Sequence, residues 1–119
     1  MYSYNDAITI LINKFSELKQ VYDENIEEYR ELPYVFYESV FTKYIVEKIQ
    51  LMKKEDLIII CNFLENLIEN GDDEIKNLVE VSVIESIYYE KDFEKFKGVL
   101  MGFCGNLTKL SFEKCYSNW

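Results

Sequence analysis

Apolar residues recur at helical spacing on both sides of a short polar turn in the stretch 57–89. On the first side they lie three and four residues apart, and the pattern ends before Gly71. This spacing predicts an amphipathic helix, and glycine best accepts the left-handed conformation that often follows a helix. Asp72, Asp73 and Glu74 come next, where acidic side chains suit an N-cap and the positive end of a helix dipole. The pattern therefore predicts a central helical hairpin.

Similar spacing recurs along the rest of the chain. We predict a helix from Asn5 to Val21, one from Pro33 to Met52, one from Phe93 to Met101 and a last one capped by Asn106. The acidic segment 23–32 is a loop or a continuation of the first helix. Residues 79–83 alternate like a strand, but we interpret them as helical because the apolar pattern continues beyond them. The sequence thus predicts one all-α domain over residues 1–119, an antiparallel bundle of five to six helices around the central hairpin.

The charge of the chain is negative and uneven. The net charge is −9, and residues 1–90 hold 19 of the 22 acids against 8 of the 13 bases, a balance of −11. Residues 91–119 hold 3 acids and 5 bases, a balance of +2. An acidic body repels nucleic acid and anionic membranes and attracts basic proteins. We expect a basic protein partner, no nucleic acid and no membrane, although acidity for solubility alone fits the charge as well.

Histidine is absent from the sequence. Its absence excludes Ser-His and Cys-His nucleophile pairs and the usual Cys/His zinc sites. Neither GxxxxGK nor GxGxxG occurs, so no phosphate-binding loop of these types is predicted. We expect no enzyme activity, no cofactor and no metal. A Ca²⁺ or Mg²⁺ site at Glu65, Glu69, Asp72 and Asp73 is the alternative, but a solvated helix end explains these carboxylates more simply.

The cysteines and the N-terminal residues indicate a cytoplasmic protein. The first residues lack the basic and apolar regions of a signal peptide, and no apolar stretch is long enough to span a bilayer. Cys61, Cys104 and Cys115 are an odd number of cysteines, which we interpret as reduced thiols. Cys61 and Cys115 lie within apolar patterns and are expected in the core.

Two acidic segments are candidate partner-binding surfaces. Patch one consists of Glu24, Glu27, Glu28, Glu31, Tyr34 and Tyr37, and patch two consists of Glu65, Glu69, Asp72, Asp73 and Glu74. Tyrosine suits an interface because it combines a large apolar ring with a polar tip. Consecutive tyrosines cannot both point inward from a helix, so Tyr89 is a further candidate. Such patches speed encounter with a basic protein at low salt.

Two other side chains carry expectations of their own. Glu65 and Glu85 occupy matching positions in two similar apolar runs, 63–68 and 83–88. If they face each other between the helices they need hydrogen-bond partners, since buried charge is costly; the alternative is that both reach solvent. Trp119 is expected to fold back on the body because an exposed indole is unfavourable.

The sequence resembles the small all-helical immunity proteins of bacterial toxin–immunity systems, such as polymorphic toxins and contact-dependent inhibition. The resemblance spans most of residues 30–119. It rests on Leu32-Pro33-Tyr34 opening a helix, on the helix-turn-helix through Phe63-Leu64-Glu65, Gly71-Asp72 and Val83-Ile84-Glu85, and on Leu100-Met101-Gly102 before a last helix. The acidic, tyrosine-bearing surface is also similar in style to nuclease-colicin immunity proteins. The resemblance implies no catalysis, no cofactor and one tight protein partner.

Three functions are therefore open. The first is an immunity protein that neutralises a cognate toxin, with a basic nuclease as the class that the charge favours. The second is an acidic inhibitor from a mobile element that mimics nucleic acid, or a regulatory protein-interaction domain. The third is an enzyme or metal protein that uses carboxylates only. A homodimer through exposed aromatic residues is an open alternative for the oligomeric state.

Overall fold

The computed structural model describes residues 1–117, so the expectation for Trp119 lies outside the described residues. Within them the chain forms eight helices and no strand, which confirms the all-α class and gives more helices than predicted. The labelled elements are α1 (Ala7–Lys14), α2 (Glu17–Glu24), α3 (Ile26–Tyr29), α4 (Pro33–Phe36), α5 (Thr42–Gln50), α6 (Lys54–Asn70), α7 (Asp73–Leu78), α8 (Glu85–Tyr88), α9 (Phe93–Met101) and α10 (Asn106–Ser117). The radius of gyration is 13.5 Å, the value expected of a compact chain of this length.

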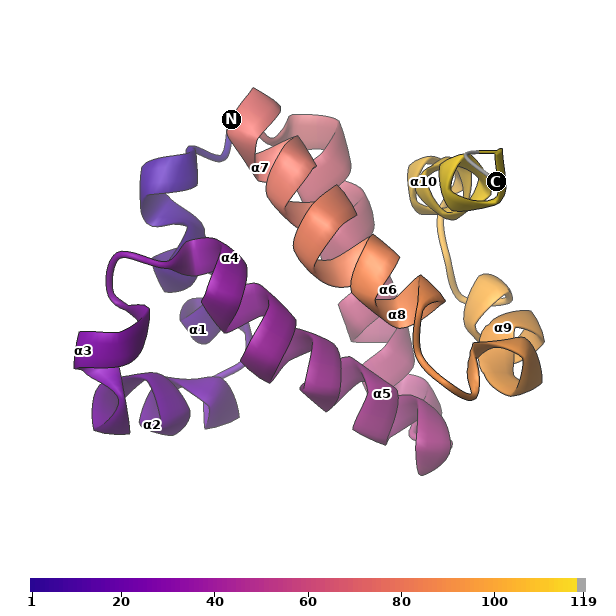
Figure 1. Ribbon diagram of the computed structural model, residues 1–119, viewed down its shortest axis with the longest axis horizontal. Coiled ribbons are helices and arrows are strands. Elements are labelled where there is room, and N and C mark those ends of the chain that lie inside the picture. Colours follow the sequence, from indigo (N-terminus) through magenta and orange to yellow (C-terminus); the bar gives the residue numbers. More distant parts are fainter. Residues whose placement is uncertain (118–119) are drawn as a thin grey trace.

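Two pairs of labelled elements are continuous helices. The π-helical segment Tyr37–Phe41 joins α4 to α5, and the π-helical segment Val79–Ile84 joins α7 to α8 (Figure 1). The two widened segments pack against each other, and the hydroxyl of Thr42 donates to the Ser82 carbonyl at 2.8 Å. The Ser82 hydroxyl in turn donates to the Tyr34 carbonyl at 2.9 Å. Residues 79–83 are thus helical as predicted, in a form that the sequence pattern did not indicate.

The first predicted helix is broken in the structure. Phe15 leaves the helical conformation, with φ −121° and ψ 84°, and separates α1 from α2. Its ring turns into the core, where it lies 5.3 Å from the Phe41 ring and 5.2 Å from the Phe63 ring. The acidic segment after it is largely helical and forms the end of α2 and α3. The break at Phe15 and the separate helix α3 together account for the two helices beyond the six predicted.

The turn between α6 and α7 is built differently from the prediction. Gly71 has φ −84° and ψ 159°, which is extended rather than left-handed. Tyr2 pairs beside it, with its N–H on the Asn70 carbonyl and its carbonyl accepting from the Asp72 N–H, both at 2.8 Å. A Cβ on Gly71 would collide with the Ile75 side chain. Glycine is therefore required here by close approach and not by backbone conformation.

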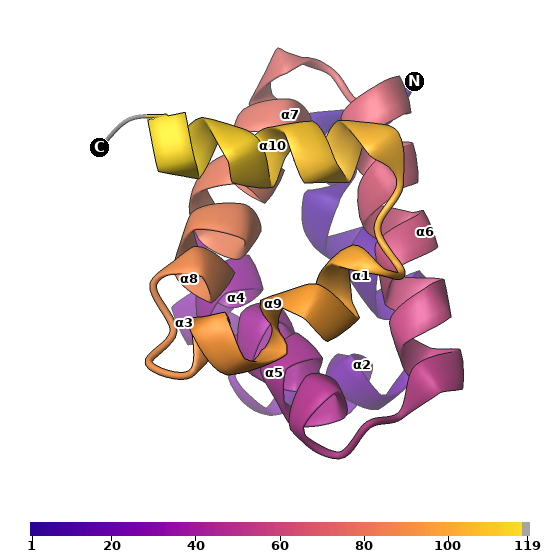
Figure 2. The ribbon, with the colours of Figure 1, turned by 90° about the vertical axis from the view of Figure 1, so that its right-hand side faces the viewer.

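The C-terminal helices cover one side of the molecule. Helix α10 crosses over α6 and α8, and α9 lies against α5 (Figure 2). Phe93 and Phe112 stack with ring centroids 5.9 Å apart between these two helices. Cys61, Cys104 and Cys115 are buried and unbonded, as expected of reduced core thiols.

Candidate partner-binding surface

The start of α7 carries the best-defined part of patch two. Asp72 is the N-cap of α7, as predicted: Oδ1 accepts from the Ile75 N–H at 2.8 Å and Oδ2 accepts from the Tyr4 N–H at 2.9 Å. These backbone hydrogen bonds, that from Tyr4 first, hold the pKa of Asp72 below its ordinary value. Because both oxygens accept hydrogen bonds from the backbone, Asp72 positions the turn, and its predicted contact with a partner stays a prediction.

Three other carboxylates of this region face solvent. Glu69 near the end of α6 and Asp73 and Glu74 in the first turn of α7 are exposed. Within residues 1–117 none of the three forms a salt bridge. Asp73 and Glu74 also lie in the first turn of α7, at the positive end of the helix dipole. The structure therefore leaves the charge of this region available to an external cation.

Tyr34 links the two predicted patches. Its hydroxyl donates to Glu74 Oε2 at 2.9 Å and accepts from Asn77 Nδ2 at 2.8 Å. Its ring lies 5.8 Å from that of Tyr4. Burial, which outweighs the hydrogen bond from Asn77, raises the pKa of Tyr34, so the hydroxyl remains a donor at neutral pH. The start of α4 and the start of α7 thus form one surface.

Two members of this surface were not predicted. Asn77 lies three residues after Glu74, so helical spacing already placed both on one side of α7. Tyr4 had no comparable signal, because its position depends on the pairing of Tyr2 with the turn at Gly71.

The prediction for Tyr37 is wrong. Its side chain is completely buried, and the hydroxyl donates to the Ala7 carbonyl at 2.7 Å. Its ring packs edge-to-face on Phe41 with centroids 5.8 Å apart. Burial strongly raises the pKa of this hydroxyl, which stays protonated. Tyr37 is a core residue that ties α4 to α1, and no partner can reach it.

Glu65, which we predicted as a partner-binding residue, is engaged by hydrogen bonds within the chain. One carboxylate oxygen accepts from the Leu107 N–H at 3.0 Å and the other from the Thr108 N–H at 2.9 Å. The Thr108 hydroxyl adds a third hydrogen bond at 2.8 Å. Burial by itself raises the pKa of Glu65, but these three hydrogen bonds together lower it by more. The pKa of Glu65 therefore lies below its ordinary value. Glu65 thus caps α10, whereas Glu85 is half-buried and does not pair with it.

The remaining acids of patch one lie elsewhere. Glu24 ends α2, Glu27 and Glu28 lie on α3, and Glu31 follows α3; all four are exposed. In both ribbon views α3 lies apart from the start of α7 (Figures 1 and 2). Of patch one, Tyr34 therefore joins patch two, whereas Glu27 and Glu28 on α3 lie apart from it (Figures 1 and 2).

Tyr89 lies at the opposite end of the continuous helix that begins at Asp73. Its side chain is 60% exposed and the ring meets that of the half-buried Tyr88 edge-on, at 5.1 Å. One ring of the pair thus faces outward, as predicted. Its position separates it from the start of α7, so it is not part of the same surface.

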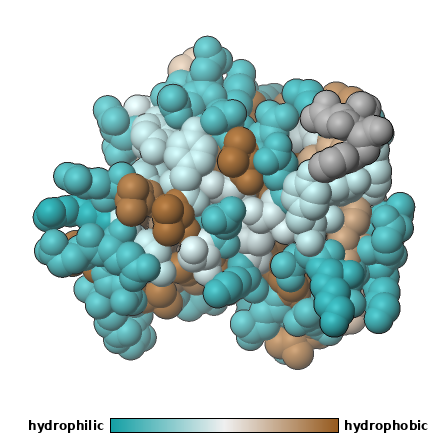
Figure 3. Space-filling model, in the orientation of Figure 1, coloured by the Kyte–Doolittle hydropathy of each residue, from teal (hydrophilic) through white to brown (hydrophobic). Residues whose placement is uncertain are grey.

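The face seen in Figure 3 is dominated by hydrophilic side chains, with hydrophobic ones in separate spots. Among residues 1–117 no three His, Cys, Asp or Glu side chains cluster so that they could hold a metal ion. Within the same described range, no helix is long and apolar enough to cross a membrane.

Comparison with known proteins adds a family. A family model described as a domain of unknown function, DUF7674, matches residues 8–108. The chain belongs to this family. No curated protein and no solved structure matches the chain. The DUF7674 region includes Tyr34, Glu69, Asp73 and Glu74, whereas Tyr4 lies just before it.

Proposed function

We propose that this chain is an immunity protein: a cytoplasmic, non-catalytic protein that binds a cognate bacterial toxin domain and occludes its active site. The charge favours a basic nuclease as the toxin. In this proposal the helices form an antiparallel bundle around the hairpin of α6 and α7–α8, and this bundle is the rigid support of the binding surface. The resemblance to small helical immunity proteins supports the proposal.

The observation that carries the proposal is the unneutralised acidic surface at the start of α7. Glu69, Asp73 and Glu74 are exposed and unpaired by any base among residues 1–117. A pair of opposite charges about 4 Å apart gains only about 1 kcal/mol in water and several-fold more when water is excluded. The attraction between these carboxylates and a basic partner is therefore strongest where the interface excludes water. That is the case where this chain closes off the partner's active site.

The mechanism that we propose is steric and electrostatic. The carboxylates take the positions that substrate phosphates would occupy on a nuclease. Tyr34 provides an aromatic ring held in place by Glu74 and Asn77. Because Tyr34, Glu74 and Asn77 are already hydrogen-bonded to one another in the free protein, their side chains lose little conformational entropy on binding.

A nucleic-acid-mimicking inhibitor with several targets is the second candidate. It is favoured by the distribution of charge, because Glu27 and Glu28 on α3, which lies apart from the start of α7 (Figures 1 and 2), are exposed as well. A mimic of this kind would bind several unrelated basic nucleic-acid-binding proteins, whereas an immunity protein would protect against one toxin.

Co-expression with the product of the adjacent upstream gene tests the proposal. We expect the neighbour alone to kill cells, and this chain to restore growth and to purify with it. The double substitution Glu69→Lys and Asp73→Lys should slow association about tenfold or more at low salt, and high salt should reduce the difference.

The matched control is Glu27→Lys with Glu28→Lys, which makes the same charge change on α3. If only this control slows association, patch one is the binding surface. If the neighbour is harmless and nothing purifies with this chain, the immunity proposal is wrong. Inhibition of several unrelated basic nucleases would support the mimic instead.

A further inference from the structure

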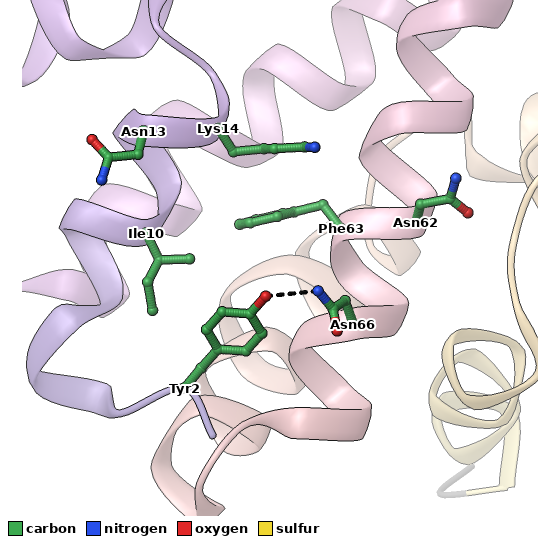
Figure 4. Close-up of a pocket in the computed structure, with 7 residues that line it drawn as sticks. All are labelled: Tyr2, Ile10, Asn13, Lys14, Asn62, Phe63 and Asn66. Atoms are coloured by element: carbon green, nitrogen blue, oxygen red, sulfur yellow. Dashed lines mark hydrogen bonds between the residues drawn. The ribbon is translucent and has the colours of Figure 1, made fainter.

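A pocket of about 440 Å³ lies between α1 and α6 (Figure 4). Ile10 and Phe63 give it an apolar floor, and Lys14 and Phe63 point toward each other across it. Asn13 and Asn62 point outward at its two rims. The volume is in the range that a single bulky side chain or small ligand fills.

The charge of this pocket is opposite to that of the rest of the protein. Although the chain has 22 acidic residues, no carboxylate lines the pocket, and Lys14 is its one cation. The Lys14 ammonium forms no salt bridge with residues 1–117. An acidic group bound next to the apolar floor would therefore meet an unpaired positive charge without a competing carboxylate in the lining.

Two carboxamides of α6, those of Asn66 and Asn70, lie beside the groove, whereas that of Asn62 points away from the pocket (Figure 4). Asn66 and Asn70 are four residues apart. Four residues of helix rise by about 6 Å, and two residues of extended chain by about 6.6 Å, so carboxamides at this spacing match alternate peptide groups. Each carboxamide has both a donor and an acceptor, as each peptide group does.

These two carboxamides are held in place before any ligand binds. Asn66 Nδ2 donates to the Tyr2 hydroxyl at 2.7 Å, and Asn70 Nδ2 donates to Asn66 Oδ1 at 2.6 Å (Figure 4). The side chains of Asn13 and Asn62 form no hydrogen bond within residues 1–117 and keep their full capacity. A second hollow of about 320 Å³ shares Tyr2 and Asn66 and extends the groove toward Asn70.

We propose that this groove binds an extended internal segment of another protein, in which an apolar side chain is followed by an acidic one. The apolar side chain fills the pocket over Ile10 and Phe63. The acidic side chain pairs with Lys14, and the carboxamides of Asn66 and Asn70 bind the backbone. No carboxylate lines this pocket, and the site requires a ligand of the opposite charge to that of the acidic surface, so it does not depend on the proposed function.

The test is a titration of the ¹⁵N-labelled full chain with two end-capped hexapeptides of Ser and Gly. One carries a central Phe-Glu pair and the other a central Phe-Lys pair. We expect the Phe-Glu peptide to shift the side-chain NH₂ resonances of Asn66 and Asn70 and to bind at least tenfold more tightly than the Phe-Lys peptide. Asn70→Ala should weaken binding about three- to tenfold, the value of one hydrogen bond.

Charge reversal supplies the decisive variant. Lys14→Glu should reverse the preference in favour of the Phe-Lys peptide. Lys54→Glu, the same charge change at the exposed start of α6, should leave it unchanged. Because the readout is a ratio of two affinities, a small loss of stability does not obscure it.

Several results would overturn the proposal. They are the absence of shifts at millimolar peptide, shifts confined to the start of α7, and a preference that Lys14→Glu does not change. Binding only by peptides with a free C-terminal carboxylate would also overturn it, because the occupant would then be a chain terminus.

Discussion

Glu65 on α6 caps α10 through Thr108, because one carboxylate oxygen accepts both the backbone N–H of Thr108, at 2.9 Å, and its hydroxyl, at 2.8 Å. The first N–H groups of a helix have no partner within the helix. A cap is usually supplied by the residue just before the helix, and we expected Asn106 in that role. Here it comes from another helix, so the cap also fastens α10 to the body.

Removal of this cap should destabilise the protein. Hydrogen bonds to a charged group contribute about 1.5–3 kcal/mol, and an N-cap about 1 kcal/mol. We expect Glu65→Ala to lower the free energy of unfolding by about 2 kcal/mol in urea denaturation. Glu69→Ala, one turn later on the same helix and exposed, should change it by less than about 0.5 kcal/mol. Equal losses in the two variants would contradict the cap.

Gly105 should be as important as Glu65 for the same contact. A Cβ at this position would collide with the Glu65 carboxyl carbon and would lie 2.8 Å from its Cγ. Gly105→Ala would therefore push the carboxylate away from α10, and we expect a loss similar to that of Glu65→Ala. In the double variant the two losses should not add, because both remove one interaction.

Gly98 is the matched control for this substitution. It lies inside α9, and a Cβ there would meet no atom within 4 Å. Gly98→Ala should stabilise the protein by about 0.5–1 kcal/mol, since alanine favours a helix more than glycine does. Additive losses for Glu65→Ala and Gly105→Ala would show that the two positions act separately.

The buried hydroxyl of Tyr37 gives a prediction that separates structure from binding. Tyr37→Phe removes the hydrogen bond to the Ala7 carbonyl and should cost about 1 kcal/mol of stability. It should not change association with a partner, since the side chain is buried. Tyr34→Phe should show the reverse, slower association with a smaller stability loss. Urea denaturation and association kinetics of both variants measure this, and weaker binding by a normally stable Tyr37→Phe protein would contradict our assignment.

The sequence predicted the helical stretches well where burial alone sets the pattern, as in α7–α8 and α9. It did not predict the break at Phe15, because that break depends on rings of Phe41 and Phe63, which are distant in sequence. The π-helical segments were equally hidden. Their stabilising contacts, such as Thr42 to Ser82, join two helices that local spacing treats separately.

Local sequence was equally insufficient to predict which single side chains of the candidate surface are buried and which are exposed. Tyr34 and Tyr37 lie on one helix with aromatic and apolar neighbours, and only the packing of Tyr37 on Ala7 decides which one is buried. Glu65 did carry a signal, because an acid within an apolar run needs a partner. The sequence did not indicate where these partners come from, and the structure supplies mostly backbone N–H groups of α10, a helix distant in sequence.

Acid should destabilise the protein through Glu65 and Asp72. Both have a folded-state pKa below their ordinary values of 4.5 and 3.8. Protonation therefore favours the unfolded chain, so their contribution is fully present above these ordinary values and is lost as the pH falls through the lower folded values. Urea midpoints should fall as the pH is lowered from about 5 toward 3. Glu65→Gln should flatten this decline, and an unchanged pH profile in that variant would refute the linkage.

Cys61 and Cys104 should form a disulfide under oxidation. Their sulfur atoms are 4.0 Å apart in the core, one on α6 and the other between α9 and α10. A disulfide needs a sulfur separation of about 2.05 Å, so a small shift of the α9–α10 connection would suffice. Cys115 instead directs its thiol to the Ser111 carbonyl within α10.

We expect mild treatment of the folded protein with diamide to link Cys61 to Cys104 and leave Cys115 free. Peptide mapping by mass spectrometry reads out the pairing. Cys104→Ser should prevent the cross-link, whereas a Cys61–Cys115 link in the folded wild-type chain would show that α10 moves much further than this packing allows.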